Sequence, residues 1–269
     1  MKTTYTVLDS TDLKPASGSR HEFGLDVLHG LSGDPKNLPS KYFYDQEGSR
    51  IFQKITALQE YYLTRCELEA LELHQDRLSR LMTGQPFHLI ELGVGDGHKT
   101  KVIIRRFLAD HLKFNFAPID IAKPVIHSLT EGMEEEFPGL EVTGIVSDYF
   151  DGIRWLSQLD NRRKLVLFLG SNIGNFHRDE TLSFLRTLWN SLNHDDLVLV
   201  GFDLKKNIET MTRAYNDRSG ITREFNLNLL NRINRELGAN FNLDQFEHYS
   251  TYDVYTGAME SYLVSLSQQ

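Results

Sequence analysis

The chain has little of what several classes of protein need. Its 269 residues include one cysteine, Cys66, which excludes an intramolecular disulfide and a cysteine-only metal cluster. We expect a buried apolar thiol there, in a reducing compartment. No window holds the ~18 uncharged apolar residues of a membrane-spanning helix, and Met1–Asp9 lacks the apolar core of a signal peptide. The sequence therefore predicts a soluble, cytoplasmic protein.

A surplus of positive charge is also missing. The formal net charge is -8, which gives no general attraction to nucleic acid or to anionic lipid. The ten histidines show no H-E-x-x-H spacing, and paired cysteines are absent from the sequence, so no metal site is predicted. We expect neither a nucleic acid nor a membrane as a partner.

What the sequence does contain is an ordinary globular composition, with 40% hydrophobic and 25% charged residues, and a regular alternation of strands and helices. The expected strands are Phe87–Leu92, Phe116–Asp120, Glu141–Val146, Lys164–Leu169 and Asp196–Asp203. The expected helices are Thr64–Met82, His98–Leu108, and 122–137, 151–158 and 179–193. A capping box, Thr64-Arg-Cys-Glu67, marks the first helix start. Such alternation is typical of a doubly wound, parallel α/β sheet with helices on both faces.

The two ends of the chain have a different character. Residues 1 to about 40 contain scattered glycines and prolines, so we expect a loosely ordered lead segment. Tyr42–Tyr62 is rich in aromatic and aliphatic side chains, which is also compatible with an ordinary core. After Asp203 the pattern predicts helices at about 205–216 and 221–237 and then a β-hairpin within Tyr249–Leu266.

The strongest local signal for a ligand is a glycine loop between the first strand and its helix, Ile90-Glu-Leu-Gly-Val-Gly-Asp-Gly-His-Lys-Thr100. Such a loop lets a ligand approach the backbone, and the helix N-terminus offers N–H groups. The spacing Gly93-x-Gly95-x-Gly97 is not the G-x-G-x-x-G of dinucleotide folds, and the phosphate-loop pattern is missing. A nucleotide-type ligand other than a nicotinamide cofactor or ATP is favoured.

Acidic residues stand at the ends of the next two strands. Asp120 could bind the two ribose hydroxyls of an adenosine. In Ser147-Asp148-Tyr149 the carboxylate could accept from the adenine amino group while the aromatic side chain covers the ring. Each alone could be an ordinary strand-end or turn residue. Together, at the carboxyl ends of successive strands, they favour an adenosine ligand.

The fourth expected strand ends in Leu169-Gly-Ser-Asn-Ile-Gly-Asn175. Glycine and asparagine form regular structure poorly, so this segment is expected to be a site loop, with a plain turn as the alternative. Asn175 is both donor and acceptor and could bind a substrate amine and carboxylate together.

Seven short motifs carry a family resemblance that covers about residue 34 to residue 266. They are Tyr42-Phe-Tyr-Asp-Gln-Glu-Gly-Ser49, Ile55-Thr-Ala-Leu-Gln-Glu-Tyr-Tyr-Leu-Thr-Arg65, Glu91-Leu-Gly-Val-Gly95, Phe168-Leu-Gly-Ser-Asn-Ile-Gly-Asn175, Arg213-Ala-Tyr-Asn-Asp217, Phe225-Asn226 and Asn231-Arg-Ile-Asn-Arg-Glu-Leu237. In this order they resemble the histidine-specific S-adenosylmethionine-dependent methyltransferases. This is the family of the ergothioneine-pathway histidine Nα-methyltransferase, whose fungal relatives methylate tryptophan-derived ergot precursors.

The resemblance implies a Rossmann-like class I methyltransferase domain at 66–204, with S-adenosylmethionine as cofactor. It implies a smaller α+β substrate-binding domain built from 1–65 and 205–269. The expected partner is a small amino acid substrate, and the expected state is a monomer or weak homodimer. In the family a further segment, with a Glu and a Ser that contact the substrate imidazole, follows the stretch matching Glu260–Leu266. This sequence stops at Gln269, so we expect either a truncated sequence or a short protein with a pocket open on that side.

Individual residues follow from the same resemblance. The cofactor site would consist of Gly93, Gly95, Lys99, Asp120, Asp148, Tyr149 and Gly170. The amino acid pocket would consist of Tyr44, Phe52, Tyr61, Asn175 and Tyr215, with Tyr44, Tyr61 and Asn175 as catalytic residues. Asn175 and Tyr215 would hold the amine and carboxylate. Tyr149 stands where some relatives have Phe.

Three functions remain open at this point. The first is methyl transfer to the α-amine of histidine or a related amino acid, an in-line displacement that mainly requires a positioned neutral amine. The second is a regulatory or partner protein that binds S-adenosylmethionine but has an incomplete substrate pocket. The third is an aromatic-rich interaction module, for which no cofactor binding is expected.

Overall fold

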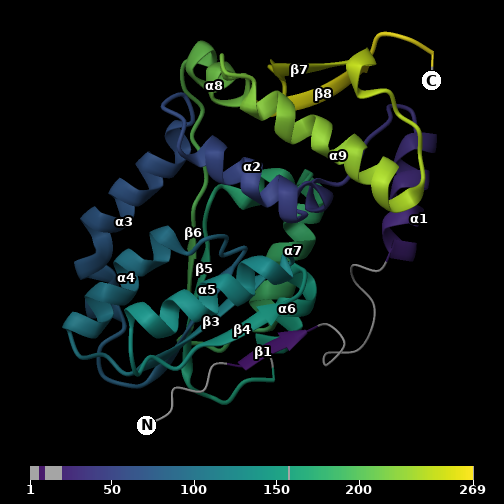
Figure 1. The fold of residues 1–269 in the computed structure, drawn as a ribbon. Coiled ribbons are helices and arrows are strands. Elements are labelled where there is room, and N and C mark those ends of the chain that lie inside the picture. The colour runs from purple at the N-terminus through teal and green to yellow at the C-terminus, as the bar shows by residue number, and fades with distance from the viewer. Residues whose placement is uncertain (1–5, 10–19, 157, 269) are drawn as a thin grey trace. The chain divides into compact units, whose positions relative to one another are not determined.

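The structure, a computed structural model, describes residues 6–9, 20–156 and 158–268 and divides into two compact units (Figure 1). Unit 1 holds strand β1 (Thr6–Asp9) and Arg65–Asp203, and unit 2 is built from Gly18–Thr64 and Leu204–Gln269. The resemblance implies that all of 1–65 belongs to the substrate-binding domain, whereas β1 belongs to the sheet of unit 1.

Unit 1 is built on a six-stranded sheet with the order β1-β4-β3-β2-β5-β6, in which every neighbouring pair is parallel. Its other strands are β2 (Phe87–Leu92), β3 (Phe114–Asp120), β4 (Thr143–Val146), β5 (Arg163–Phe168) and β6 (Leu197–Val200). Every residue of β2 is buried, as expected for a central strand covered on both faces. All five predicted strands are present.

Helices cover both faces of this sheet (Figure 1). They are α3 (Tyr62–Leu81), α4 (His98–Ala109), α5 (Lys123–Glu136), α6 (Tyr149–Leu156) and α7 (Arg178–Asn190). Leu89 points into a core shared with α4 and α5, and the next residue, Ile90, points into a separate core shared with α6 and α7. The doubly wound α/β fold predicted from the sequence is confirmed.

The strand order fixes where a ligand can bind. From β2 the chain proceeds to β3 and β4 on one side, and then returns to place β5 and β6 on the other side of β2. In an open parallel sheet, ligands bind outside the carboxyl ends of the strands at this reversal. The glycine loop after β2 and the loop after β5 therefore lie at the expected binding edge.

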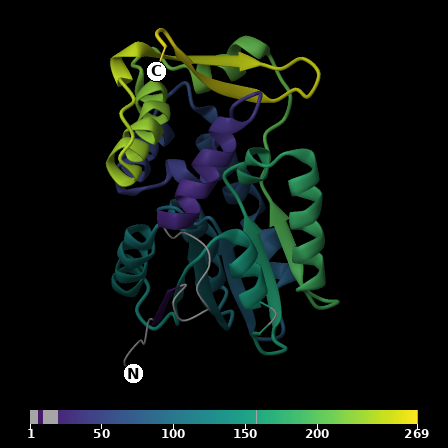
Figure 2. The same ribbon diagram turned by 90° about the vertical axis from the view of Figure 1, so that its right-hand side faces the viewer.

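Unit 2 combines helices with a two-stranded antiparallel sheet (Figure 2). Its elements are α1 (Arg20–Ser32), η1 (Ser40–Phe43), α2 (Gln46–Thr56), α8 (Ile208–Tyr215), α9 (Ile221–Leu237), η3 (Leu243–Gln245), β7 (Phe246–Tyr252) and β8 (Met259–Ser265). The central helix is α9, which contributes Leu227, Leu229 and Ile233 to the core. The β7–β8 hairpin packs on α8 and α9, so the predicted helices and hairpin of this region are confirmed.

The expectation of a loosely ordered lead segment is wrong for the residues that the structure describes there. Helix α1 buries Phe23 and Val27 in the same core as α9. Gly30 lets the backbone of Asn37 approach this helix, because a Cβ there would lie 2.1 Å from the Asn37 carbonyl oxygen. The glycines in this segment lower its predicted helix propensity. The helix is stabilised by tertiary burial rather than by local propensity.

The start of α3 also differs from the prediction. The helix begins at Tyr62, and the Glu67 side chain binds Lys99 and Gly170 instead of closing a capping box with Thr64. The Cys66 side chain is exposed rather than buried. The buried face of α3 follows Leu63 and Leu71, and Cys66 lies outside it. Among the described residues, no helix is long and apolar enough to cross a membrane.

Candidate functional site

The glycine loop after β2 adopts a backbone that favours glycine. Gly93, Gly95 and Gly97 have φ angles of 72°, 56° and 67°, in the left-handed region. A Cβ at Gly93 would lie 2.6 Å from the Tyr149 hydroxyl oxygen and 2.8 Å from the Asn172 side-chain nitrogen. At Gly95, a Cβ would meet no atom of the described residues within 4 Å. The loop is thus packed against side chains at Gly93 but leaves open space at Gly95, where a ligand can approach the backbone.

Asp120, the last residue of β3, is anchored beside this loop. Its Oδ2 accepts a hydrogen bond from the Gly95 N–H at 3.1 Å, and its Oδ1 accepts one from the Ala122 N–H at 3.0 Å. Burial raises the pKa of this carboxyl, and the backbone N–H groups oppose that rise. The carboxyl is held at the place where the sequence predicted a ribose contact, and that contact stays a prediction.

Asp148 and Tyr149 follow β4. Asp148 Oδ1 accepts from the Asp151 N–H at 2.8 Å, so it stabilises the first turn of α6, which is the turn role that the sequence left open. The Tyr149 ring packs against Phe168 and Phe176, with centroids 5.1 and 6.0 Å away. The Tyr149 ring is therefore part of the sheet core, while its hydroxyl reaches Gly93. The adenine contacts expected of both residues remain predictions.

Gly170 and Lys99 share a partner that the sequence did not reveal as a site residue, Glu67. The Gly170 N–H donates to both carboxylate oxygens of Glu67, at 2.9 and 2.8 Å, and the Lys99 ammonium forms a salt bridge with the same carboxylate. The Glu67 carboxylate of α3 thus connects this helix to Lys99 at the start of α4 and to Gly170 in the loop after β5. The predicted capping box gives Glu67 a local partner, Thr64, and so does not reveal this contact.

Glu91 lies in β2, two residues before Gly93, in the interior of unit 1. It is 1% exposed, and its carboxyl group shares a hydrogen bond with the Thr100 hydroxyl. Burial raises the pKa of Glu91 to about 8, although the Thr100 hydroxyl and the charge of Lys99 act in the opposite direction. Its carboxyl group is therefore mostly protonated at neutral pH.

Unit 2 gathers four of the five residues assigned to the amino acid substrate. We call Tyr44, Phe52, Tyr61, Tyr215 and the supporting Phe225 the aromatic cluster. Ring centroids are 5.5 Å apart for Tyr44 and Phe52, 6.2 Å for Phe52 and Tyr61, and 6.0 Å for Tyr61 and Tyr215, with each pair edge-to-face. Phe225 packs beneath Tyr44 and Phe52. Asn175, the fifth residue, belongs to unit 1, where it ends η2 (Asn172–Asn175) and is exposed.

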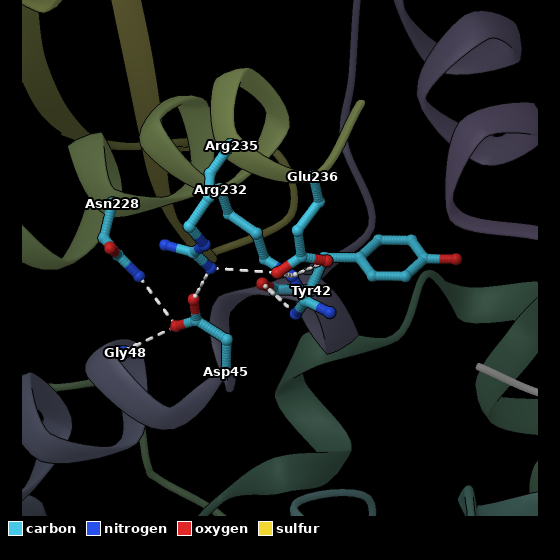
Figure 3. A network of polar contacts seen from close by, with 7 residues as sticks. All are labelled: Tyr42, Asp45, Gly48, Asn228, Arg232, Arg235 and Glu236. Carbon is cyan, nitrogen blue, oxygen red and sulfur yellow. Dashed lines mark hydrogen bonds and ion pairs between the residues drawn. The ribbon is translucent and has the colours of Figure 1, made fainter. Parts of the chain in front are cut away.

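A polar network in unit 2 involves Asp45, the residue after Tyr44 (Figure 3). Asp45 Oδ1 accepts from the Gly48 N–H at 2.7 Å, which caps α2, and from the Asn228 side chain at 2.9 Å. Asp45 Oδ2 accepts from Arg235 at 2.5 Å. Arg232 donates to the Tyr42 carbonyl oxygen at 2.9 Å. The network joins η1 and α2 to α9, and so fixes the backbone that carries Tyr44.

Comparison with known proteins identifies the family of this chain. The family described as "Histidine-specific methyltransferase, SAM-dependent" matches residues 23–269. The chain belongs to this family. Its cofactor is accordingly S-adenosylmethionine.

Several curated relatives are similar over most of the chain. The histidine N-alpha-methyltransferase of Mycolicibacterium smegmatis is 36% identical over 91% of this chain and 75% of its own length. The enzyme of the same name from Mycobacterium tuberculosis is 34% identical over 88% of this chain and 73% of its own length. Ergothioneine biosynthesis protein 1 of Schizosaccharomyces pombe is 33% identical over 84% of this chain and 30% of its own length.

The chemistry of the residues at the sheet edge fits this cofactor. Acidic side chains at the ends of β3 and β4 suit the hydroxyl and amino groups of adenosine, and Lys99 suits a carboxylate. The open space beside Gly95 allows a ligand to approach the backbone. Among the described residues, no group of three His, Cys, Asp or Glu side chains is placed to hold a metal ion.

Proposed function

We propose that this protein transfers the methyl group of S-adenosylmethionine to the α-amine of histidine or a closely related amino acid. The observation that carries the proposal is the aromatic cluster. Four residues assigned to the amino acid by resemblance lie in one edge-to-face group, in a chain 36% identical to a histidine N-alpha-methyltransferase. The predicted small amino acid substrate is consistent with the aromatic cluster and with this similarity.

The strand order supports a direction for the cofactor along the sheet edge. Asp148, at the end of β4, is assigned to adenine, and Asp120, at the end of the neighbouring β3, to ribose. The glycine loop after β2 comes next, and Gly170 after β5 follows it. The methionine end of the cofactor would then lie toward Gly170 and Lys99.

The bound cofactor supplies an electrophilic methyl group on a sulfonium. Displacement in line forms a nitrogen–carbon bond, breaks the carbon–sulfur bond and leaves a thioether, so the protein mainly has to position a neutral amine. An α-amine has an unperturbed pKa of ~7.7 to 8.0 in peptides and a higher one in free amino acids, and removal from water favours its neutral form. Tyr61 is 7% exposed, so this part of the aromatic cluster excludes water. Tyr44 and Tyr61 are our candidates for orienting the amine through their hydroxyl oxygens.

The aromatic cluster also suits a product that carries positive charge. Cation–π contact with an electron-rich ring contributes ~0.5 to 2 kcal/mol. A methylated ammonium could therefore remain bound, lose a proton and accept a further methyl group. We propose repeated methylation to the trimethylated amino acid. Mass spectrometry of the product is the test, and a product that carries one methyl group after exhaustive reaction would contradict it.

The main experiment separates cofactor binding from turnover. Titration calorimetry with S-adenosylhomocysteine tests the cofactor site, and a screen of the twenty amino acids as methyl acceptors tests the reaction. We expect Asp120→Ala to abolish measurable cofactor binding, with the exposed Asp195→Ala as the matched control. Asn175→Ala is expected to raise KM for the amino acid while leaving cofactor affinity unchanged, with the exposed Asn190→Ala as its control.

The outcomes distinguish the functions that the sequence left open. Cofactor binding together with methylation of histidine supports the proposal. Binding without turnover on any amino acid would favour a regulatory or partner protein. Absence of binding would refute both and favour an interaction module.

A further inference from the structure

Glu67 and Lys99 form an ion pair beside the loop after β5. Their side chains are only 15% and 19% exposed, so solvent screens the pair less than it screens a surface salt bridge. The Glu67 carboxylate also accepts from the Gly170 N–H with both oxygens. One negative and one positive group are thus fixed together at the carboxyl edge of the sheet.

The backbone makes room for this carboxylate at a second glycine. A Cβ at Gly201, just after β6, would lie 1.8 Å from Glu67 Oε1. Gly201 has no left-handed backbone that would itself require glycine, and its N–H donates to the Phe168 carbonyl oxygen at 2.9 Å. The absence of a side chain at Gly201 therefore serves the position of Glu67.

The strand order indicates what this pair faces. Adenine and ribose are assigned to the ends of β4 and β3, so the opposite end of an extended S-adenosylmethionine extends past β2 toward β5. That end is an amino acid, with one ammonium and one carboxylate at neutral pH. Lys99 can pair with the carboxylate. A carboxylate accepts about four hydrogen bonds, so Glu67 retains acceptor capacity beyond Lys99 and Gly170.

We propose that Glu67 binds the α-ammonium of the cofactor's methionine end, while Lys99 binds its α-carboxylate. This inference rests on the proposed function, because it concerns the same cofactor site. Glu67 thereby selects for the complete cofactor over fragments that lack the ammonium. The Gly170 N–H orients the Glu67 carboxylate, and Gly201 leaves the space that it occupies.

The test uses three ligands that differ in this end alone. S-adenosylhomocysteine carries both charged groups, its deaminated analogue keeps only the carboxylate, and 5′-methylthioadenosine has neither. Calorimetry on the full chain measures Kd for each. Glu67→Gln is expected to weaken S-adenosylhomocysteine about 10- to 100-fold, the range for a lost charged hydrogen bond, and to change the other two less than about 2-fold. Glu69→Gln, an exposed glutamate of the same helix, is the matched control.

A second variant moves Glu67 without removing its charge. Gly201→Ala places a methyl group in the position of the Glu67 carboxylate, so it should reproduce the selective loss of S-adenosylhomocysteine affinity, by about 10-fold. Gly132→Ala is the control, because a Cβ at that α5 position meets no described atom within 4 Å. Lys99→Met should weaken S-adenosylhomocysteine and the deaminated analogue alike.

Each result decides one way. Selective loss of S-adenosylhomocysteine in Glu67→Gln and Gly201→Ala supports the ammonium contact. Equal loss of the deaminated analogue would show that Glu67 only holds Lys99 and the loop, and would overturn the inference, as would unchanged affinities. If the unmodified protein binds none of the three ligands, the proposed function itself fails.

Discussion

Glu91 gives unit 1 a dependence on pH that a single substitution should remove. In the folded protein burial raises its pKa to about 8, from an ordinary value of 4.5. Between these values the unfolded chain loses the proton while the folded chain keeps it. The folded state thus binds more protons, and the linkage relation requires stability to fall as pH rises. Glu91→Gln preserves the shape of the side chain and removes the titration.

The size of the effect follows from the two pKa values. Each pH unit in this window corresponds to ~1.4 kcal/mol, and the effect declines as the pH approaches the folded pKa. From pH 6 to pH 8, Glu91 should therefore remove about 2 kcal/mol of unfolding free energy. This is a large part of the ~5 to 15 kcal/mol by which folded proteins are stable.

Urea denaturation from pH 6 to pH 8 measures the effect. The difference in unfolding free energy between Glu91→Gln and the unmodified protein should grow by about 2 kcal/mol in favour of the variant, because other titrating groups cancel in the difference. Glu131→Gln, at an exposed position of α5, should leave the pH dependence unchanged. A Glu91→Gln difference that stays constant over this range would refute the assignment of a protonated carboxyl group.

Two further predictions concern unit 2. Gly48→Ala should destabilise it by about 3 kcal/mol in thermal or urea unfolding, because the new Cβ would lie 1.7 Å from the Phe43 carbonyl oxygen. Gly132→Ala is the neutral control, and equal stability of the two variants would contradict the close packing at Gly48. Burial raises the pKa of Asp217, but hydrogen bonds from Thr222 and neighbouring groups outweigh it and lower the pKa to about 2, from 3.8. Stability from this carboxylate is lost as pH falls from 4 to 2, on the order of 2 kcal/mol. Acid titration followed by circular dichroism should show this loss in the unmodified protein, and an equal loss in Asp217→Asn would argue against it.

The parts of the fold that the sequence predicted well are those specified by local pattern. The strand Phe87–Leu92 is a short apolar run that ends in glycines, and its buried position in the sheet matches that pattern. Helix α9 has the predicted bounds, 221–237, with glycines on both sides. The same local pattern predicts that the glycine loop and Asp120 lie at one edge of the sheet, because the carboxyl ends of parallel strands share that edge.

The parts that failed depend on partners far away in the sequence. Glu67 satisfies the local rule for a capping box, but its partner Gly170 is 103 residues away. Strand β1 is four residues long and is defined by pairing with β4, which no local pattern reveals. Helix α1 contains glycines that lower its intrinsic helix propensity, and burial of Phe23 overrides them. Rules based on neighbouring residues in the sequence do not predict contacts whose partners lie in other elements.

The family motifs contain residues whose contacts hold the fold beside residues that we propose face a ligand. Asp45 belongs to the same motif as Tyr44, yet its carboxylate is used by Gly48, Asn228 and Arg235 (Figure 3). The motif Asn231–Leu237 likewise contributes Arg232 and Arg235 to this scaffold. A network of charged hydrogen bonds fails when one partner is removed, because the remaining groups lose their compensation. Tyr44, Phe52 and Tyr215 are only partly buried, so we expect differences in acceptor among relatives to fall at these rings and not in this network.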